Sequence, residues 1–95
     1  MDLVIRFSED KNELLKSTRG IGFEEVLELI QNGSILDDLE HPALARSSQR
    51  IYLVKIKKHV YAVPYVINLK KQEIFLKTVY PSRKYTKLYL KGEKS

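Results

Sequence analysis

The sequence contains no cysteine, no tryptophan and only two histidines. The absence of cysteine excludes disulfides and thiolate metal sites. Because the carboxylates show no ligand-like spacing either, we expect no metal and no other cofactor. No apolar run approaches the ~20 residues of a membrane-spanning helix. The start of the chain, Met1-Asp2-Leu3, lacks the basic and then apolar order of a secretory signal. These absences predict a cytoplasmic protein without a membrane anchor.

Acidic residues are scarce in the second half of the chain. Residues 50–95 contain twelve Lys or Arg and two Asp or Glu, whereas residues 1–49 contain five against ten. The net charge of +5 therefore combines a half-chain of −5 with one of +10. A concentrated positive field attracts phosphate backbones, so this asymmetry favours a protein that binds nucleic acid. A lysine-rich surface that only promotes solubility is the alternative interpretation.

The length of 95 residues fits one domain, residues 1–95. The first half of the chain predicts a strand followed by two helices. The strand covers residues 3–7, and Ser8 then caps a helix that runs to about residue 18 and buries Leu14 and Leu15. Gly20 and Gly22 separate this helix from a second one, which ends at Asn32-Gly33. The apolar face of the second helix consists of Phe23, Val26, Leu27 and Ile30.

The second half predicts a meander of three antiparallel strands over residues 51–57, 60–67 and 73–79. Residues 35–39 form either an edge strand or a loose turn that Pro42 ends. Pro64 lies inside the middle strand, where it removes a hydrogen-bond donor, so we expect a bulge or an unpaired stretch there. The fold class is therefore α+β, with two N-terminal helices on one face of an antiparallel sheet and a short C-terminal helix.

The lengths of the two turns predict how the three strands pair. A two-residue turn at Lys58-His59 places Lys55 opposite Ala62, and the longer second loop places Ile67 opposite Ile74 and Lys77 opposite Pro64. One face would then carry Val54, Ile56, Val63, Tyr65, Leu76 and Thr78 beneath the helices. The opposite face would bring together Lys55, Lys57 and Lys77.

A final helix begins after Ser82 and has two different faces. Tyr85, Leu88 and Tyr89 share the face expected to pack on the sheet, and the opposite face carries Arg83, Lys84, Lys87 and Lys91. Arg83 and Lys84 lie in the first turn, where positive charge opposes the helix dipole. A phosphate bound there would reconcile the pattern, with the Ser82 hydroxyl as a further contact. Plain exposed surface is the alternative.

Two blocks of the chain resemble a known family. The first is Phe7, Lys11-Asn12 and the run Gly20-Ile21-Gly22-Phe23-Glu24-Glu25-Val26, and the second is Tyr80-Pro81-Ser82-Arg83-Lys84-Tyr85-Thr86. In this order they are similar to the KN helix, glycine turn and FEEA-like helix of BrnT-type toxins, and to the block that opens that family's last helix. The resemblance implies a RelE-like fold, ribonuclease activity and a type II toxin. It also implies a cognate antitoxin, a small DNA-binding protein of the ribbon-helix-helix class.

The chain departs from the family pattern at three places. Lys58-His59 stands where the family has Gly-Arg, Leu88 or Tyr89 stands near the usual glutamate of the last helix, and the aromatic pair after the first strand is reduced to Phe7. Both a diverged toxin and an inactive relative are compatible with these changes.

RNA cleavage without a metal requires groups that stabilise the charged phosphorane and groups that move protons. The catalytic candidates are Lys55, Lys77, Arg83 and His41, and the candidates for RNA and phosphate binding are Arg50, Lys57, Ser82, Lys84 and Lys87. His41 follows Glu40, whose carboxylate would raise the pKa of the imidazole. Tyr80 could stack on a base, whereas Tyr61 and Tyr65 are predicted on the core side.

Three functions are therefore compared: a ribonuclease toxin, a non-catalytic basic domain that binds RNA or DNA, and a protein-interaction module whose basic half docks an acidic partner. The first two predict an affinity for RNA that falls steeply with salt, and the third predicts none.

Overall fold

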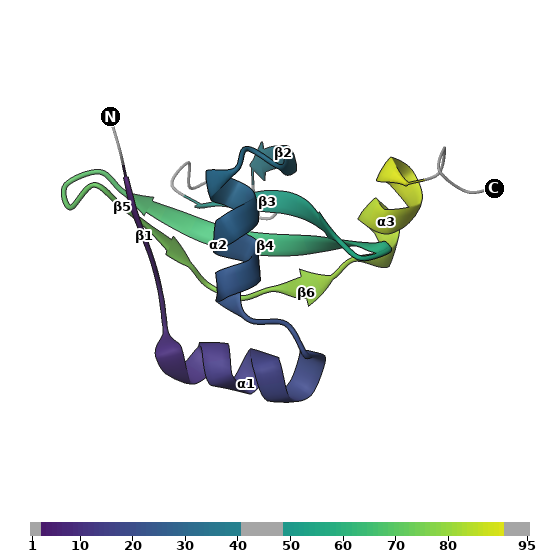
Figure 1. The fold of residues 1–95 in the computed structure, drawn as a ribbon. Helices are drawn as coiled ribbons and strands as arrows, with labels where there is room; N and C mark the ends of the chain where they lie inside the picture. The colour runs from purple at the N-terminus through teal and green to yellow at the C-terminus, as the bar shows by residue number, and fades with distance from the viewer. Residues whose placement is uncertain (1–2, 41–48, 91–95) are drawn as a thin grey trace.

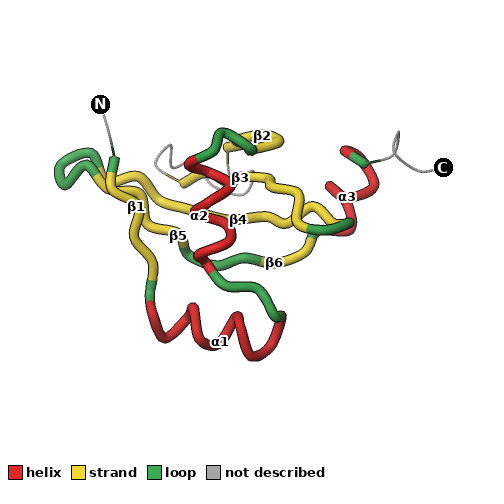
Figure 2. Tube along the Cα trace, viewed as in Figure 1, coloured by secondary structure: helices red, strands yellow, loops and turns green. Residues whose placement is uncertain are grey.

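The computed structural model describes residues 3–40 and 49–90. They form an α+β fold in which three helices surround a mixed, open sheet of six strands (Figures 1 and 2). In chain order the elements are β1 (Val4–Phe7), α1 (Glu9–Arg19), α2 (Phe23–Gln31), β2 (Ile35–Glu40), β3 (Gln49–Ile56), β4 (His59–Asn68), β5 (Glu73–Leu76), β6 (Tyr80–Pro81) and α3 (Arg83–Tyr89). The α+β class is confirmed, and residues 35–40 form a strand at one edge of the sheet.

The sheet is mixed, so the expectation of an antiparallel sheet throughout was wrong. The strand order is β1-β5-β4-β3-β2, and β6 also pairs with β4. The β2–β3, β3–β4 and β4–β5 pairs are antiparallel, but β1 runs parallel to β5. Strands joined by a tight turn must be antiparallel, whereas the long connection from β1 to β5 allows either direction.

The pairing of β4 with β5 follows the predicted register, and the pairing of β3 with β4 does not. Ile67 lies opposite Ile74, as expected. Lys55, however, lies opposite Val60 instead of Ala62, because the turn consists of Lys57 and Lys58. A shift of two residues leaves every side chain on its predicted face, since side chains alternate with a period of two. The shift does move the lysines along the sheet.

A break in the segment that pairs with β4 lies beside Pro64. β5 ends at Leu76, and the chain pairs with β4 again only at β6, where Ala62 faces Tyr80. The Lys77 N–H donates to the Pro64 carbonyl (2.8 Å), so the missing N–H of Pro64 points toward this break. The interruption moves Val79 into the core, fully buried, where Thr78 was predicted.

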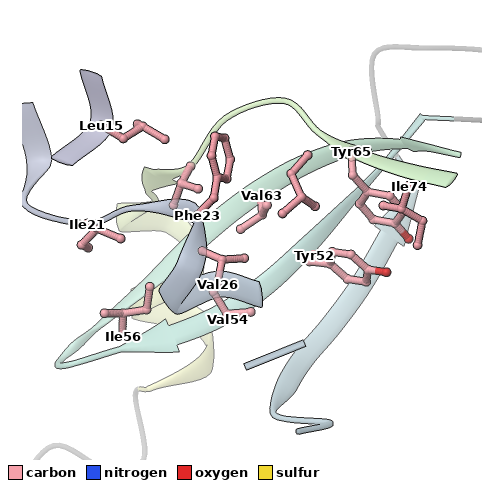
Figure 3. Close-up of a cluster of buried hydrophobic side chains, with 12 residues drawn as sticks. Leu15, Ile21, Phe23, Val26, Tyr52, Val54, Ile56, Val63, Tyr65 and Ile74 are labelled. Atoms are coloured by element: carbon pink, nitrogen blue, oxygen red, sulfur yellow. The ribbon is translucent and has the colours of Figure 1, made fainter. Parts of the chain in front are cut away.

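One face of the sheet, here called the helix face, packs against α1 and α2. Its core contains Leu15 from α1, Phe23 and Val26 from α2, and inward side chains of the strands such as Val54 and Val63 (Figure 3). Phe7 at the end of β1 stacks on Phe23 with ring centroids 4.8 Å apart. Leu14 was predicted to be buried with Leu15, but it is 53% exposed because it lies on the outer side of α1.

The opposite face of the sheet, here called the α3 face, carries a smaller core. Ile51, Leu53, Val60 and Ala62 are buried there. Tyr85, Tyr89 and Leu90 of the C-terminal segment pack against them. Leu88 was expected on the same side as these tyrosines, but it is 63% exposed. The helix has only seven residues, so its contact with the sheet is narrow.

Candidate nucleic-acid interface

The turn between β3 and β4 presents two adjacent lysines, Lys57 and Lys58. Ile56 and His59 pair across this two-residue turn. Lys57 has a φ of 59°, a left-handed conformation that lysine adopts at a cost and that glycine or asparagine adopts readily. Both lysines are exposed. The turn therefore holds two cations at the tip of the β3–β4 hairpin.

Helix α3 begins beside this turn because it is hydrogen-bonded to the start of β4. The Ser82 N–H donates to the Val60 carbonyl (2.9 Å), and the Val60 N–H donates to Thr86 Oγ1 (2.8 Å). The Ser82 hydroxyl caps α3 by accepting from the Tyr85 N–H (3.2 Å), as the sequence predicts. Figure 1 shows the hairpin tip and α3 at the same end of the molecule.

The far side of α3 is anchored to the edge strand β2. The Tyr89 hydroxyl donates to Asp37 Oδ2 (2.6 Å), which lowers the pKa of the Asp37 carboxyl and raises the pKa of the Tyr89 phenol. Tyr85 and Tyr89 meet edge to face, with ring centroids 6.2 Å apart. Their rings face the sheet, so the charged residues of α3 point outward.

Together, the hairpin tip and α3 form a cluster of six exposed cations, here called the basic end. Its members are Lys55, Lys57, Lys58, Arg83, Lys84 and Lys87. Between Gln49 and Leu90 the sequence has a single acidic residue, Glu73, which lies on β5. The ammonium of Lys84 lies 5.4 Å from the Tyr85 ring centroid, a distance typical of a cation–π contact. The basic end is thus a concentrated positive surface built from two elements.

Most of the predicted site residues lie at the basic end, but Lys77 does not. Lys55 lies opposite Val60 on β4. The Lys77 N–H instead donates to the carbonyl of Pro64, four residues further along the same strand. At ~3.4 Å per residue this offset is about 13 Å, so the predicted pairing of Lys55 with Lys77 was wrong. The two-residue shift of the hairpin explains the separation. His41 lies outside the described residues.

Arg50, predicted to bind phosphate, is engaged elsewhere. Its Nε donates to Asp38 Oδ1 (3.0 Å), and another guanidinium nitrogen donates to the Asp38 carbonyl (2.9 Å). The contact with the carboxylate raises the pKa of Arg50. Arg50 lies opposite Tyr65 on the helix face, whereas Lys55 and α3 lie on the other face. This ion pair therefore fastens β2 to β3 and is separate from the basic end.

Two stacked tyrosines complete the attachment of β2. The Tyr65 hydroxyl donates to Asp38 Oδ1 (2.6 Å), and its ring stacks on Tyr52 with centroids 4.0 Å apart (Figure 3). Burial raises the pKa of both phenols, and the hydrogen bond to Asp38 raises that of Tyr65 further. Within the described residues, every fully buried side-chain nitrogen or oxygen has a hydrogen-bond partner. We interpret this cluster as structural.

Lys58 belongs to the basic end but is not among the residues expected there from the sequence, because the expected turn, Lys58-His59, lies one residue later than the observed one. A pair of adjacent lysines between two strand patterns is itself an indication of an exposed turn, because strand interiors rarely accommodate two charged neighbours.

Within residues 3–40 and 49–90, no group of three His, Asp or Glu side chains is arranged to hold a metal ion. None of the described helices has the length and apolar character needed to cross a membrane. Comparisons with models of protein families, with curated proteins and with solved structures found no match to this chain.

Proposed function

We propose that the protein binds RNA through its basic end. The observation that carries this proposal is the assembly of six cations from two separate elements, Lys55 to Lys58 on the hairpin and Arg83 to Lys87 on α3. Cations clustered on one surface release counterions from a phosphate backbone, which favours binding. The forked guanidinium of Arg83 adds directional donors for phosphate oxygens.

We further propose that the bound RNA is cleaved, and that the protein is the toxin of a type II toxin–antitoxin module with a RelE-like fold. This step rests on the resemblance to BrnT-type toxins. In such a reaction the ribose 2′-oxygen loses its proton and attacks the adjacent phosphorus. The bond from phosphorus to the 5′-oxygen breaks, and that oxygen takes a proton. Arg83 and Lys55 would stabilise the charge on the phosphorane.

A non-catalytic RNA- or DNA-binding domain is the second candidate. It is favoured by the separation of Lys77 from the basic end, because two of the proposed catalytic residues then cannot act on one phosphate. Both candidates predict RNA binding, so that property is tested first.

The test of RNA binding compares two double variants that remove the same charge. Replacing Arg83 and Lys84 by Ala should weaken binding about ten-fold or more, because charge-assisted hydrogen bonds contribute about 1.5–3 kcal/mol each. It should also reduce the dependence of log K on log salt by about 0.7 for each phosphate that the variant no longer neutralises. Replacing Lys70 and Lys71 by Ala is the control, because these exposed lysines lie in the β4–β5 turn at the opposite end of the sheet (Figure 1). Equal effects in both double variants would show that binding depends on total charge and not on the basic end.

The two candidates differ in the product. Purified protein is incubated with structured RNA in the presence of a chelator, and the ends are analysed for 2′,3′-cyclic phosphate. Cleavage that is abolished in the Arg83→Ala, Lys84→Ala variant supports the toxin. Binding without cyclic ends, together with normal growth of cells that express the protein alone, supports the non-catalytic domain.

The toxin proposal includes a cognate antitoxin, expected to be a small ribbon-helix-helix protein encoded beside this chain. An acidic segment laid over the basic end would block RNA by occupying its cations. Co-expression should give a complex that loosens as salt rises. A protein that expresses well alone and captures no small partner would count against this part of the proposal.

A further inference from the structure

Among the described residues, those of α3 cover only part of the α3 face of the sheet, and two exposed aromatic rings lie on the rest of it. Phe75 of β5 is opposite Val66, and Tyr80 of β6 is opposite Ala62, so both share the face on which α3 packs. Phe75 is 42% exposed and Tyr80 is 38% exposed. Single exposed aromatics are common on protein surfaces. Here, two are aligned on β5 and β6, the two strands that pair in succession with the same side of β4.

A lysine lies between the two rings. Lys77 is exposed and hydrogen-bonds through its N–H to Pro64, the residue midway between Val66 and Ala62 on β4. The row Phe75, Lys77 and Tyr80 thus alternates a ring, a cation and a ring. Glu73 is the acidic residue nearest to this row in sequence, and its carboxylate accepts from Arg6 Nε at 2.7 Å, which balances its charge.

The row continues into the basic end. Tyr80–Pro81 is followed directly by Ser82, whose N–H is bonded to Val60, and then by Arg83. A chain of nucleotides that begins at Phe75 and passes Lys77 and Tyr80 therefore arrives at the first cation of α3. Rings interleaved with cations are the arrangement that binds single-stranded nucleic acid, because every base has a face to stack and every linkage has a charge.

The spacing of the rings selects a single strand over a duplex. Val66 and Ala62 are four residues apart on β4, which corresponds to about 13 Å. Neighbouring bases in a stacked duplex are about 3.4 Å apart. Bases seated on Phe75 and Tyr80 would therefore be separated from each other, and only an unpaired strand can open in this way.

We propose that the open half of the α3 face is a platform for single-stranded RNA, on which bases stack on Phe75 and Tyr80 while Lys77 binds the phosphate between them. The inference rests on the proposed RNA binding and names its substrate class. It also gives Lys77 a role in binding at a position away from the basic end.

The test measures the affinity of labelled single-stranded RNA, of the same strand lacking its bases, and of a duplex of equal length, for the full chain at several salt concentrations. Phe75→Leu and Tyr80→Leu should each weaken single-strand binding about ten-fold, because stacking contributes on the order of 1–3 kcal/mol per base. Neither should change the salt dependence, since the charge of the protein is unchanged. Lys77→Met should instead reduce the salt slope by about 0.7.

Controls separate stacking from loss of fold. Phe75→Tyr and Tyr80→Phe keep a ring at each position and should bind like the original protein. Leu69→Ala removes a 74% exposed apolar side chain from the β4–β5 turn, outside the row, and should have no effect. The strand without bases should bind the original protein and the leucine variants equally. Circular dichroism and thermal unfolding verify that each variant is folded.

The outcomes distinguish the single-strand platform from the proposed RNA binding by the basic end, on which it rests. If the leucine variants bind as tightly as the original while the Arg83→Ala, Lys84→Ala variant does not, the platform is refuted and the basic end stands. The same holds if the leucine variants keep RNA but no longer bind a protein partner, because the row would then be a protein-docking surface. If the original protein binds no RNA at any salt concentration, both proposals fail.

Discussion

Lys57 combines an unfavourable backbone conformation with a charge at the tip of the β3–β4 hairpin. With a φ of 59°, its Cβ crowds the backbone in a way that glycine avoids. Residues held in such conformations are concentrated at functional sites. We therefore interpret Lys57 as a position where charge is retained at the expense of stability.

Replacing Lys57 by Gly should raise the free energy of unfolding by about 0.5–1 kcal/mol, because relief of the left-handed strain exceeds the added entropy of the unfolded chain. The same change should weaken RNA binding. Gln72→Gly is the matched control, since Gln72 has a φ of 55° but lies in the β4–β5 turn. It should stabilise similarly and leave binding unchanged. Urea unfolding and RNA titration give both quantities, and a Lys57→Gly protein that binds normally would remove this lysine from the site.

The side chain of Asn12 connects α1 to the start of α2. It is fully buried in α1, and its Oδ1 accepts from the N–H of Phe23 (2.6 Å) at the start of α2. Its Nδ2 donates to Glu24 Oε2 (2.9 Å), and this bond is the main cause that lowers the pKa of the Glu24 carboxyl. Gly22, the N-cap of α2, has no side chain that could serve this purpose. A Cβ at Gly22 would lie 2.8 Å from Asn12 Oδ1, so a larger residue there would have to displace the Asn12 side chain.

Replacing Asn12 by Ala should lower the free energy of unfolding by about 2–3 kcal/mol, because the buried N–H of Phe23 loses its partner. Ser17→Ala is the control on the same helix, because the exposed Ser17 hydroxyl bonds to the carbonyl of Leu14, one turn away. It should change stability by less than about 0.5 kcal/mol. Chemical denaturation measures both. Similar small effects in the two variants would mean that water replaces the Asn12 oxygen.

At the scale of elements, the position of α3 depends on the start of β4. Val60 uses its N–H and its carbonyl to hold Thr86 and Ser82, and the fully buried side chain of Val60 belongs to the core beneath α3. No residue of α3 is fully buried, so these hydrogen bonds add to the partly buried packing of Tyr85 and Tyr89 in attaching the helix. The cations of the helix are placed beside the hairpin tip through the same bonds.

Thr86→Val keeps the shape of the side chain and removes the acceptor for the Val60 N–H. It should lower the free energy of unfolding by about 1–3 kcal/mol, accelerate hydrogen exchange at the Val60 amide and weaken RNA binding. Thr86→Ser retains the hydroxyl and should retain most of the amide protection. Hydrogen exchange at the Val60 amide, followed by mass spectrometry or NMR, measures this protection. An unchanged Val60 exchange rate in Thr86→Val would show that apolar packing alone positions α3.

At the scale of the whole molecule, the sheet separates two surfaces of opposite character. α1 and α2 cover the helix face and together are net acidic. They carry six acidic residues, Glu9, Asp10, Glu13, Glu24, Glu25 and Glu28, against three basic ones, Lys11, Lys16 and Arg19. α3 and the basic end occupy the other face and one end of the sheet. The separation leaves the basic surface open to a polyanion, because the acidic helices pack on the other side of the sheet.

The tyrosines that fasten the edge strand β2 predict instability at alkaline pH. The pKa values of Tyr52, Tyr65 and Tyr89 are raised above 10.0 in the folded protein, chiefly by burial for the first two and by the hydrogen bond to Asp37 for Tyr89. The contribution of these tyrosines to the free energy of unfolding is therefore complete below the unfolded-state pKa of about 10. It is lost as the pH rises toward their higher pKa values in the folded state. Urea midpoints measured from about pH 8 upward should fall beyond pH 10. The urea midpoint of the Tyr65→Phe variant should fall less steeply with pH. An equal dependence on pH in the variant and the original protein would contradict this role of Tyr65.

The elements governed by local rules could be predicted from the chain alone. Ser8 and Ser82 cap helices, Asn32-Gly33 ends α2, and the alternation of Val54, Val63 and Leu76 assigns their common face, because capping and periodicity involve residues close in the chain. The charge asymmetry that leads to the basic end is likewise visible in composition.

Where these elements meet depends on tertiary pairing and could not be predicted in the same way. The parallel placement of β1 beside β5 and the break that turns Val79 inward depend on pairing between segments that are far apart in the chain. The turn at Lys57 depends on which of two registers β3 and β4 adopt. A shift of two residues preserves the face of every side chain, so periodicity could not reveal it. That shift nevertheless places Lys55 beside α3 and leaves Lys77 about 13 Å along the sheet, because each residue of a strand adds a fixed rise.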